Sequence, residues 1–445
     1  MITQNEINIA RECISYAKAY GADAVRVSIS DSTMDGCTIL NGVLDKVTHA
    51  ADRSIYLYVY ADKRYGTFST NRLEKADLEM FIRQSVDMVR MLGEDECRSL
   101  PDPARTAKDA VTGRELGLYD ARYEQSDSDS RLARAKQMSH FADFEGKDFD
   151  LISEECEYSE SYDDNFVVDS QGFEGRHTET CFSVFAETTI QDPNGAKYSG
   201  FWWESSFDMD GINLEGCSKK ALERAARQIG PKKRRSGHYK MVVDTSVATK
   251  LVSPILTALN ASSIQQKMSF LDGTLGQRIF PENMTLMDLA RTPRRNGSRL
   301  FDTEGVATKD APIIENGVVK QYFVNTYMAA KMDIEPTVED ISRPCLLPFD
   351  EKELSLEDLL RASGSGILVT GFNGGNSNPV TGDFSFGIEG FAFSKGKITH
   401  PVREMLITGN IMELWNNLTA VGSDARPSVR WQIGSLAFDN VSFSA

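Results

Sequence analysis

Hydrophobic positions in the first 95 residues change from helical spacing to alternation and back again. Apolar residues recur every three or four positions over residues 5–20 and 74–92, which predicts two amphipathic helices, the first capped by Asn5 and ended by Gly21. Between them, apolar and polar residues alternate in short segments, which predicts strands at residues 24–30, 43–47, 54–60 and 64–69. We therefore expect an α+β domain over residues 1–95.

The same order of patterns recurs further along the chain. Residues 130–142 and 213–229 have helical spacing, and four segments between residues 150 and 204 alternate. This predicts a second sheet and a central α+β domain over residues 130–230, although no sequence repeat is visible. Residues 96–129 are rich in Asp, Pro, Ser and Gly, which predicts a linker.

From residue 236 the pattern changes to short strands and many glycines. Helical spacing is confined to residues 245–259 and 356–363, and strands are expected at residues 318–324, 366–371, 383–394, 405–408 and 436–441. We expect a C-terminal domain over residues 236–445. The predicted fold class is α+β, with N-terminal helix–sheet–helix domains followed by a larger β-rich C-terminal domain.

Composition and charge narrow the classes of function. The 445 residues are 41% hydrophobic and 26% charged, which is enough for two or three globular cores. A net charge of −16 repels phosphate backbones and anionic lipid, so direct binding to nucleic acid or membranes is disfavoured, and the basic run 232–235 is interpreted as an interdomain linker. No secretory pattern or membrane-length apolar run is present, and the seven scattered cysteines lack CxxC spacing, so we expect a cytoplasmic protein.

No self-sufficient catalytic constellation is visible in the sequence. None of the five histidines lies in an HExxH or HExxxH motif. His177 and Glu179 would share a face of a strand and could ligate a metal, but no third ligand stands at a recognisable spacing. There is no nucleophile elbow, P-loop or dinucleotide fingerprint. Trp202 and Trp203 are interpreted as packing residues rather than a stacking platform.

Several segments resemble one known family. They are residues 297–308, 314–322, 375–385, 409–410 and 421–424, together with residues 21–26 and 41–44 near the start of the chain. In order and content these segments resemble the TldD/PmbA family, whose members were once described as modulators of DNA gyrase. The resemblance implies a cytosolic metalloprotease of two subunits that degrades or processes small unfolded peptides. The TldD subunit holds zinc through HExxxH and a cysteine near its C-terminus, and the PmbA (TldE) subunit lacks both.

This sequence is similar to the PmbA/TldE-type subunit. At the place of HExxxH, residues 251–259 read Leu-Val-Ser-Pro-Ile-Leu-Thr-Ala-Leu, and residues 424–431 contain no cysteine. A zinc site for hydrolysis needs about three protein ligands, a bound water and a carboxylate base. Ligands and base are missing together, so we expect no catalytic residue and no bound metal in this chain, with zinc in its partner.

Two functions therefore compete. The first is a non-catalytic subunit that pairs with a TldD-like zinc subunit and holds the peptide, and the alternative is an autonomous, homodimeric peptide-binding or scaffold protein. An independent hydrolase and a DNA-related role rank behind them. An extended peptide binds most simply by adding a strand to a sheet edge. The candidate peptide-binding residues are Arg299, Asp302, Glu304, Asn376, Asp383 and Ser385, for which hydrogen bonding within turns and sheets is the other interpretation.

Overall fold

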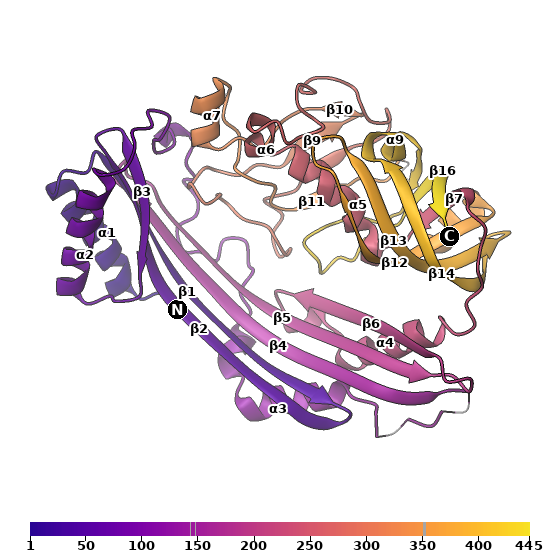
Figure 1. Cartoon of the computed structure of the whole chain (residues 1–445). Helices are drawn as coiled ribbons and strands as arrows, with labels where there is room; N and C mark the ends of the chain where they lie inside the picture. The colour runs from indigo at the N-terminus through magenta and orange to yellow at the C-terminus, as the bar shows by residue number, and fades with distance from the viewer. Residues whose placement is uncertain (143, 147, 350–352) are drawn as a thin grey trace.

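A long, curved antiparallel sheet forms one side of the molecule, and a β-rich C-terminal unit lies over its concave face (Figure 1). The computed structural model describes residues 1–142, 144–146, 148–349 and 353–445. Within these ranges helices and sheets are both abundant, and the C-terminal part contains ten of the sixteen strands, most of them short. The expected α+β fold class is confirmed.

The large sheet has six strands in the order β3-β2-β1-β4-β5-β6. Its first half contains α1 (Gln4–Ala19), β1 (Ala24–Leu40), β2 (Val43–Ala61), β3 (Arg64–Thr70) and α2 (Lys75–Val89). Its second half repeats the order as α3 (Ser128–Met138), β4 (Asp150–Asp169), β5 (Glu174–Gln191), β6 (Lys197–Ser206) and α4 (Leu214–Ala226). The two halves meet where β1 pairs with β4, from Arg26↔Asp169 to Leu40↔Glu155. The expectation of a separate second sheet was therefore wrong.

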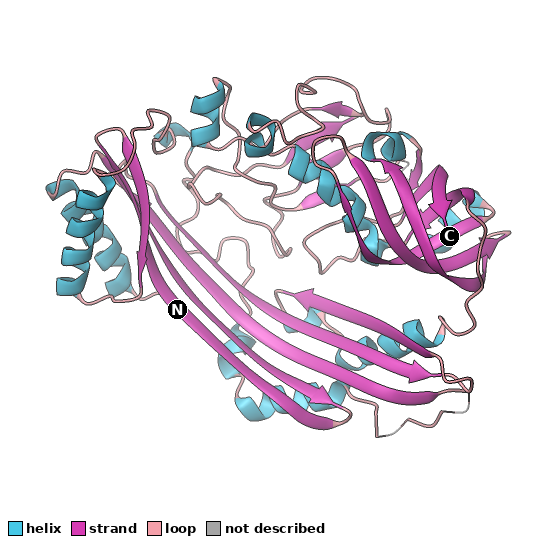
Figure 2. Ribbon diagram, in the orientation of Figure 1, coloured by secondary structure: helices cyan, strands magenta, loops and turns pink. Residues whose placement is uncertain are grey.

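All four helices cover the same face of this sheet, at its two ends (Figure 2). Val25, Val27 and Ile29 of β1 pack with α1 and α2 at one end. Cys37 and Ile39 of the same strand pack with α3 and α4 at the other. Because side chains alternate along a strand, the even-numbered residues of β1 point to the opposite, concave face. That face is the one turned toward the C-terminal unit.

The first helix begins earlier than expected because its cap is Thr3 rather than Asn5. The Thr3 hydroxyl accepts a hydrogen bond from the backbone N–H of Glu6 at 3.3 Å, and the Glu6 carboxylate accepts one from the N–H of Thr3 at 2.7 Å. This reciprocal pair satisfies two backbone donors that have no partner within the helix. The start of the chain is thereby held in place beside β1.

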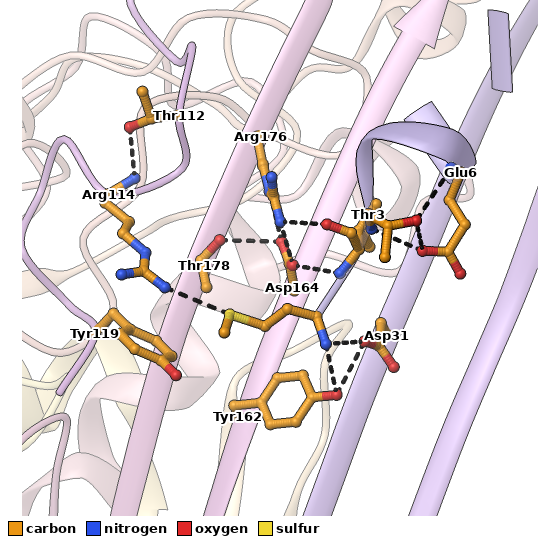
Figure 3. A network of polar contacts seen from close by, with 12 residues as sticks. Thr3, Glu6, Asp31, Thr112, Arg114, Tyr119, Tyr162, Asp164, Arg176 and Thr178 are labelled. Carbon is orange, nitrogen blue, oxygen red and sulfur yellow. Dashed lines mark hydrogen bonds and ion pairs between the residues drawn. The ribbon is translucent and has the colours of Figure 1, made fainter. Parts of the chain in front are cut away.

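A buried polar network extends this anchorage across three strands (Figure 3). The ammonium group of Met1 lies 2.7 Å from the Asp31 carboxylate of β1. Asp164 of β4 has a fully buried side chain that accepts from the N–H of Ile2 at 2.9 Å and from the Arg176 guanidinium of β5 at 2.6 Å. Several donors converge on each carboxylate, which is the condition under which a buried charge is tolerated.

The segment predicted as a linker is ordered and follows β5 closely. It contains η1 (Pro103–Arg105) and η2 (Ala121–Gln125). The carbonyls of Ala110, Gly113 and Leu118 accept hydrogen bonds from the N–H groups of three β5 residues at 2.8–3.0 Å. The segment therefore continues the pairing of β5 beyond the end of β6, and its buried apolar side chains pack with Phe173 and Phe301. The division of the chain into domains stays a proposal.

Five strands of the C-terminal unit close into a barrel. Its sheet has the order β14-β13-β12-β7-β16-β15, and β14 also pairs with β16. The elements are β7 (Gly237–Val243), α5 (Thr245–Ala258), α6 (Ala261–Gln265), β8 (Leu286–Asp288), β9 (Ala311–Glu315), β10 (Val318–Val319), α7 (Thr326–Met332), β11 (Pro344–Leu346), α8 (Leu356–Ser363), β12 (Gly366–Ser377), β13 (Asp383–Ser394), β14 (Lys397–Asn410), α9 (Ile411–Asn416), β15 (Leu418–Val421) and β16 (Leu436–Ser444). A four-stranded sheet, β10-β9-β8-β11, lies beside it. Across the described ranges, no helix is both long and apolar enough to cross a membrane.

Candidate functional site

Two neighbouring cavities lie between the large sheet and the C-terminal unit. The first, the α5 cavity, has a volume of about 810 Å³ and is lined by one side of α5, by β6 and by residues 426–431. The second, the sheet cavity, has a volume of about 560 Å³ and is lined by the concave face of the sheet and by residues 296–303. Asn296 and Arg430 line both. Both volumes fall in the range of about 300–1,000 Å³ that is typical of ligand pockets.

The amphipathic pattern of α5 determines which of its residues reach the α5 cavity. Leu251, Val252 and Ile255 are fully buried in the barrel core. The polar positions 246, 249, 250 and 253 follow helical spacing on the other side and carry two serines, a threonine and a lysine. Most of residues 251–259, where the family resemblance locates HExxxH, therefore face the core. Most of the residues that α5 turns to the cavity precede residue 251 in the sequence.

The two places at which the zinc motifs were expected lie together in the structure. Lys250 and Ser253 of α5 line the same cavity as Val429 and Trp431. Zinc is held in proteins by cysteine, histidine and carboxylate ligands, and the side chains that α5 turns to the cavity are hydroxyls and an ammonium group. These residues do not fit a zinc ion. Among the described residues, no group of three or more His, Cys, Asp or Glu side chains could hold a metal, His177 and Glu179 included.

Aromatic side chains and a guanidinium form the β6 wall of the α5 cavity. Arg426 lies over the rings of Trp202 and Trp203, 4.5 and 4.3 Å from their centroids, and donates to the Trp203 carbonyl. Burial lowers the pKa of this guanidinium. Trp202 is 6% exposed and acts as a packing residue, whereas Trp203 is 37% exposed and Phe201 47%, and both line the cavity. The wall offers apolar contact area next to positive charge.

The free edge of β6 is already partly occupied by side chains. Gln228 donates to the Ser199 carbonyl at 2.6 Å, and Arg426 donates to that of Trp203. Asn296 accepts from the N–H of Phe207 at 2.9 Å. Such contacts block addition of another strand unless they are displaced. Strand addition by a peptide stays a prediction, and at β6 it would require these side chains to move.

The sheet cavity has a carboxylate on its sheet wall, and two guanidiniums together with the Asp302 carboxylate on the other wall. On the sheet, His177 lies 3.3 Å from Glu179, and Ser28, Ser30 and Asn165 are among the other residues of that wall. On the C-terminal unit, Arg299 and Arg430 line the other wall. Beside this cavity, burial and the charge of Glu179 raise the pKa of Asp163.

Three of the six candidate residues lie at or near the sheet cavity. Arg299 and Asp302 line it, whereas the Glu304 carboxylate lies just outside and accepts from the N–H and hydroxyl of Thr326 at 2.8 Å. Arg299 donates to the Ser342 hydroxyl at 2.8 Å. Asp302 accepts from three backbone N–H groups at 3.0 Å, and burial raises its pKa to about 6. All three therefore also hold loops in place.

The other three candidates are grouped elsewhere. Asn376 and Ser385 are exposed register partners at the end of the β12–β13 hairpin. Asp383 is exposed and accepts from the Thr381 hydroxyl at 2.7 Å and from Asn410 at 3.0 Å, which lowers its pKa. None of these three residues lines the α5 cavity or the sheet cavity. The candidates thus fall into two separate groups.

Family models match most of the chain. The PmbA/TldA metallopeptidase domain 1 matches residues 25–89, the central domain matches residues 122–229, and the C-terminal domain matches residues 236–445. Among curated proteins, metalloprotease PmbA of Escherichia coli O157:H7 is 26% identical over 93% of this chain and 91% of its own length. The metalloprotease PmbA homolog of Haemophilus influenzae is 27% identical over 90% of this chain and 88% of its own.

Solved structures with the same fold span the whole chain. A crystal structure from Bacteroides thetaiotaomicron, described as that of a candidate modulator of DNA gyrase, superposes with a TM-score of 0.94 at 40% identity and covers 100% of both chains. TldE from Thermococcus kodakarensis superposes with a TM-score of 0.84 at 19% identity, over 98% of this chain and 100% of its own. At that identity the second match concerns the fold alone.

Proposed function

Since this chain belongs to the PmbA/TldD metallopeptidase family, we propose that it is the non-catalytic, PmbA/TldE-type subunit of a two-subunit zinc protease. Its partner would be a TldD-like subunit that holds the zinc. Together they would degrade or process small unfolded peptides in the cytoplasm. In this arrangement the present chain helps to enclose the site of cleavage and holds the substrate.

One observation carries the proposal: the side chains that α5 presents to its cavity. Ser246, Thr249, Lys250 and Ser253 line it, and the segment that closes the cavity on the other side contributes Arg430 and Trp431. Lys250 adds a positive charge where a cationic metal would have to bind, and repulsion between like charges disfavours such binding. The cavity keeps aromatic and apolar walls, which suit a peptide side chain.

The open part of β2 supports association with another chain. β3 pairs with β2 only from Ile55 to Ala61, and within the described part of the chain no strand pairs with the outer side of residues 43–54. Val43 and Val47 in this stretch are 68% and 63% exposed, and Leu44 is 41% exposed. A long, unpaired edge with exposed apolar side chains is a site at which another chain can add a strand, although charged residues such as Asp45 and Lys46 also stand on it.

Co-expression with a TldD-like subunit tests the proposal. The two chains should co-elute from gel filtration as one species that contains zinc and cleaves unfolded casein. The present chain purified alone should contain no stoichiometric zinc and cleave nothing. Zinc and activity in the isolated chain, reproduced after metal supplementation and absent from mock preparations, would refute the assignment.

The alternative is an autonomous homodimer that binds peptides without cleaving them. The open β2 edge favours such a homodimer, because two copies of the same strand can pair about a twofold axis. Sedimentation of the purified chain separates the two functions. A stable homodimer that does not exchange its subunits when a TldD-like chain is added would support the alternative against the proposal.

A further inference from the structure

The roof of the sheet cavity concentrates positive charge. Arg299 and Arg430 both donate to residues 340–342: Arg299 to the Asp340 carbonyl at 3.0 Å and Arg430 to the carbonyls of Ile341 and Ser342. Partial burial and the neighbouring Arg299 lower the pKa of Arg430. The carboxylates of Asp288 and Asp340 offset part of this charge, but Arg299 and Arg430 still repel each other. A bound anion would remove this repulsion.

A buried hydroxyl stands beside these guanidiniums without a partner. Ser298 is 1% exposed and lines the sheet cavity, and its Oγ has no hydrogen-bond partner among the residues that the structure describes. Leaving a buried hydroxyl unpaired costs free energy, and most such groups in folded proteins are paired. The position of Ser298 on the cavity wall lets a ligand, rather than the protein, complete this bond.

The opposite wall restricts which anion fits. Glu179 faces the cavity from β5, and its charge acts on Arg430 across the cavity. Glu179 would repel a multiply charged phosphate strongly. A carboxylate carries a single charge, and at the roof it would lie on the wall opposite Glu179, so the repulsion would be weaker. Arginine pairs with carboxylates in a planar, two-pronged geometry. Asn165 and His177 on the same wall as Glu179 can bond amide groups that follow the carboxylate.

We propose that the sheet cavity binds the C-terminal carboxylate of a peptide, which Arg299, Arg430 and Ser298 hold at its roof. The inference deepens the proposed function, because it rests on the chain being a peptide-holding subunit. Asn296 and Arg430 line both cavities, so the residues that precede the carboxylate can continue into the α5 cavity. There an apolar side chain would meet Phe201, Trp203 and Trp431.

The test uses the full-length chain and an N-acetylated tetrapeptide of two alanines, a leucine and a phenylalanine. Calorimetry compares its free-acid form, its C-terminal amide and N-acetylalanine, and the fluorescence of Trp203 and Trp431 gives a second readout. The free acid should bind at least about tenfold more tightly than either of the others, since a hydrogen bond to a charged group contributes more than one to a neutral group. Equal affinity for acid and amide overturns the carboxylate site. Equal affinity for N-acetylalanine and the tetrapeptide overturns the binding of a peptide that continues into the α5 cavity.

Ser298→Ala separates binding from folding. Within the described part of the chain the hydroxyl has no partner, so its loss should leave the unfolding midpoint unchanged, while the affinity for the free acid falls about tenfold and that for the amide stays the same. Ser161→Ala is the matched control, because Ser161 lies on β4 and outside the cavity lining. Unchanged affinity in Ser298→Ala would overturn the role of Ser298. No binding of any form would overturn the carboxylate site yet leave co-elution with a TldD-like subunit, and hence the proposed function, intact.

Discussion

At the scale of single residues, charges are held where several donors converge. The Asp164 side chain is fully buried and accepts from Ile2, Arg176 and Thr178. These partners come from the start of the chain and from β5, so Ile2 lies far in sequence from both Arg176 and Thr178. For the same reason the sequence could not predict that Arg430 and Ser298 share a cavity: residues 298 and 430 meet only through the fold.

The signal that sequence reasoning missed within α5 was local. Ser246, Thr249, Lys250 and Ser253 follow helical spacing, and the apolar residues between them follow the complementary stripe. That pattern could have identified the side of the helix that faces a cavity. It could not have identified Phe201, Asn296 or Trp431 as the other walls, since only the pairing of distant strands brings them there.

Removing the Asp164 charge should destabilise the protein strongly. We expect Asp164→Asn to lower the free energy of unfolding by about 3–5 kcal/mol, because the largely buried Arg176 loses its charged partner. Urea unfolding followed by circular dichroism measures the loss. Glu174→Gln is the control: the Arg11–Glu174 pair is exposed, and its loss should cost about 1 kcal/mol or less. Equal losses in the two variants would contradict this account.

Asp302 should make stability depend on pH between about 4 and 6. Burial raises its pKa to about 6 in the folded state, above the value of about 3.9 in an unfolded chain, so the folded state binds this proton more tightly. Its contribution to stability is fully present below pH 4 and is lost as pH rises through 6. At 1.36 kcal/mol per pKa unit this amounts to roughly 3 kcal/mol.

The variant Asp302→Asn removes that proton equilibrium. The difference in free energy of unfolding between wild type and variant should therefore shrink by roughly 3 kcal/mol from pH 4 to pH 7. Urea titrations of both proteins at the two pH values measure the difference. A difference that is constant across this range would show that Asp302 keeps an ordinary pKa.

At the scale of elements, the longer helices were predicted well and α6, α7 and α9 were not predicted, while the strands of the large sheet were predicted too short. The apolar stripes of α5 and α8 give bounds within one residue of those observed. By contrast, β4 continues for 20 residues although its concave side carries Glu, Ser, Asp and Asn. A strand with neighbours on both edges keeps its backbone paired even where one face is polar, so one long strand stands where two short ones were predicted.

The contact between α4 and β6 depends on a glycine in the strand. A Cβ added at Gly200 would lie 2.3 Å from the backbone N of Ala225 and 2.4 Å from the carbonyl oxygen of Ala221. We expect Gly200→Ala to push the helix away and to destabilise the protein by about 1–3 kcal/mol. Thermal and urea unfolding measure the effect. Gly93→Ala, where a Cβ meets nothing within 4 Å, should change stability by less than about 0.5 kcal/mol. A neutral Gly200→Ala would contradict the close approach.

At the scale of the whole molecule, the open edge of β2 should decide association. In a Val43→Lys, Val47→Lys double variant, charged side chains would stand where apolar ones are exposed, so the variant should fold normally but no longer co-elute with a TldD-like subunit. Val111→Lys, at another valine that is 74% exposed, should co-elute like the wild type. If the double variant still co-elutes, the partner does not bind at β2 and this prediction is wrong.

The meeting of β1 and β4 places two units of the same helix–meander–helix order back to back in one sheet. A symmetric dimer of one such unit would have the same seam, and joining the two copies in one polypeptide fixes their ratio and their effective concentration. Joining the copies also lets the sequence of each one change independently, which is impossible for identical subunits encoded by one gene. Here β6 covers β5 from Phe182 to Gln191 and lines a cavity, while its counterpart β3 is only 7 residues long and leaves β2 open. A single chain that contains two such units can therefore have two ends that are selected for different tasks.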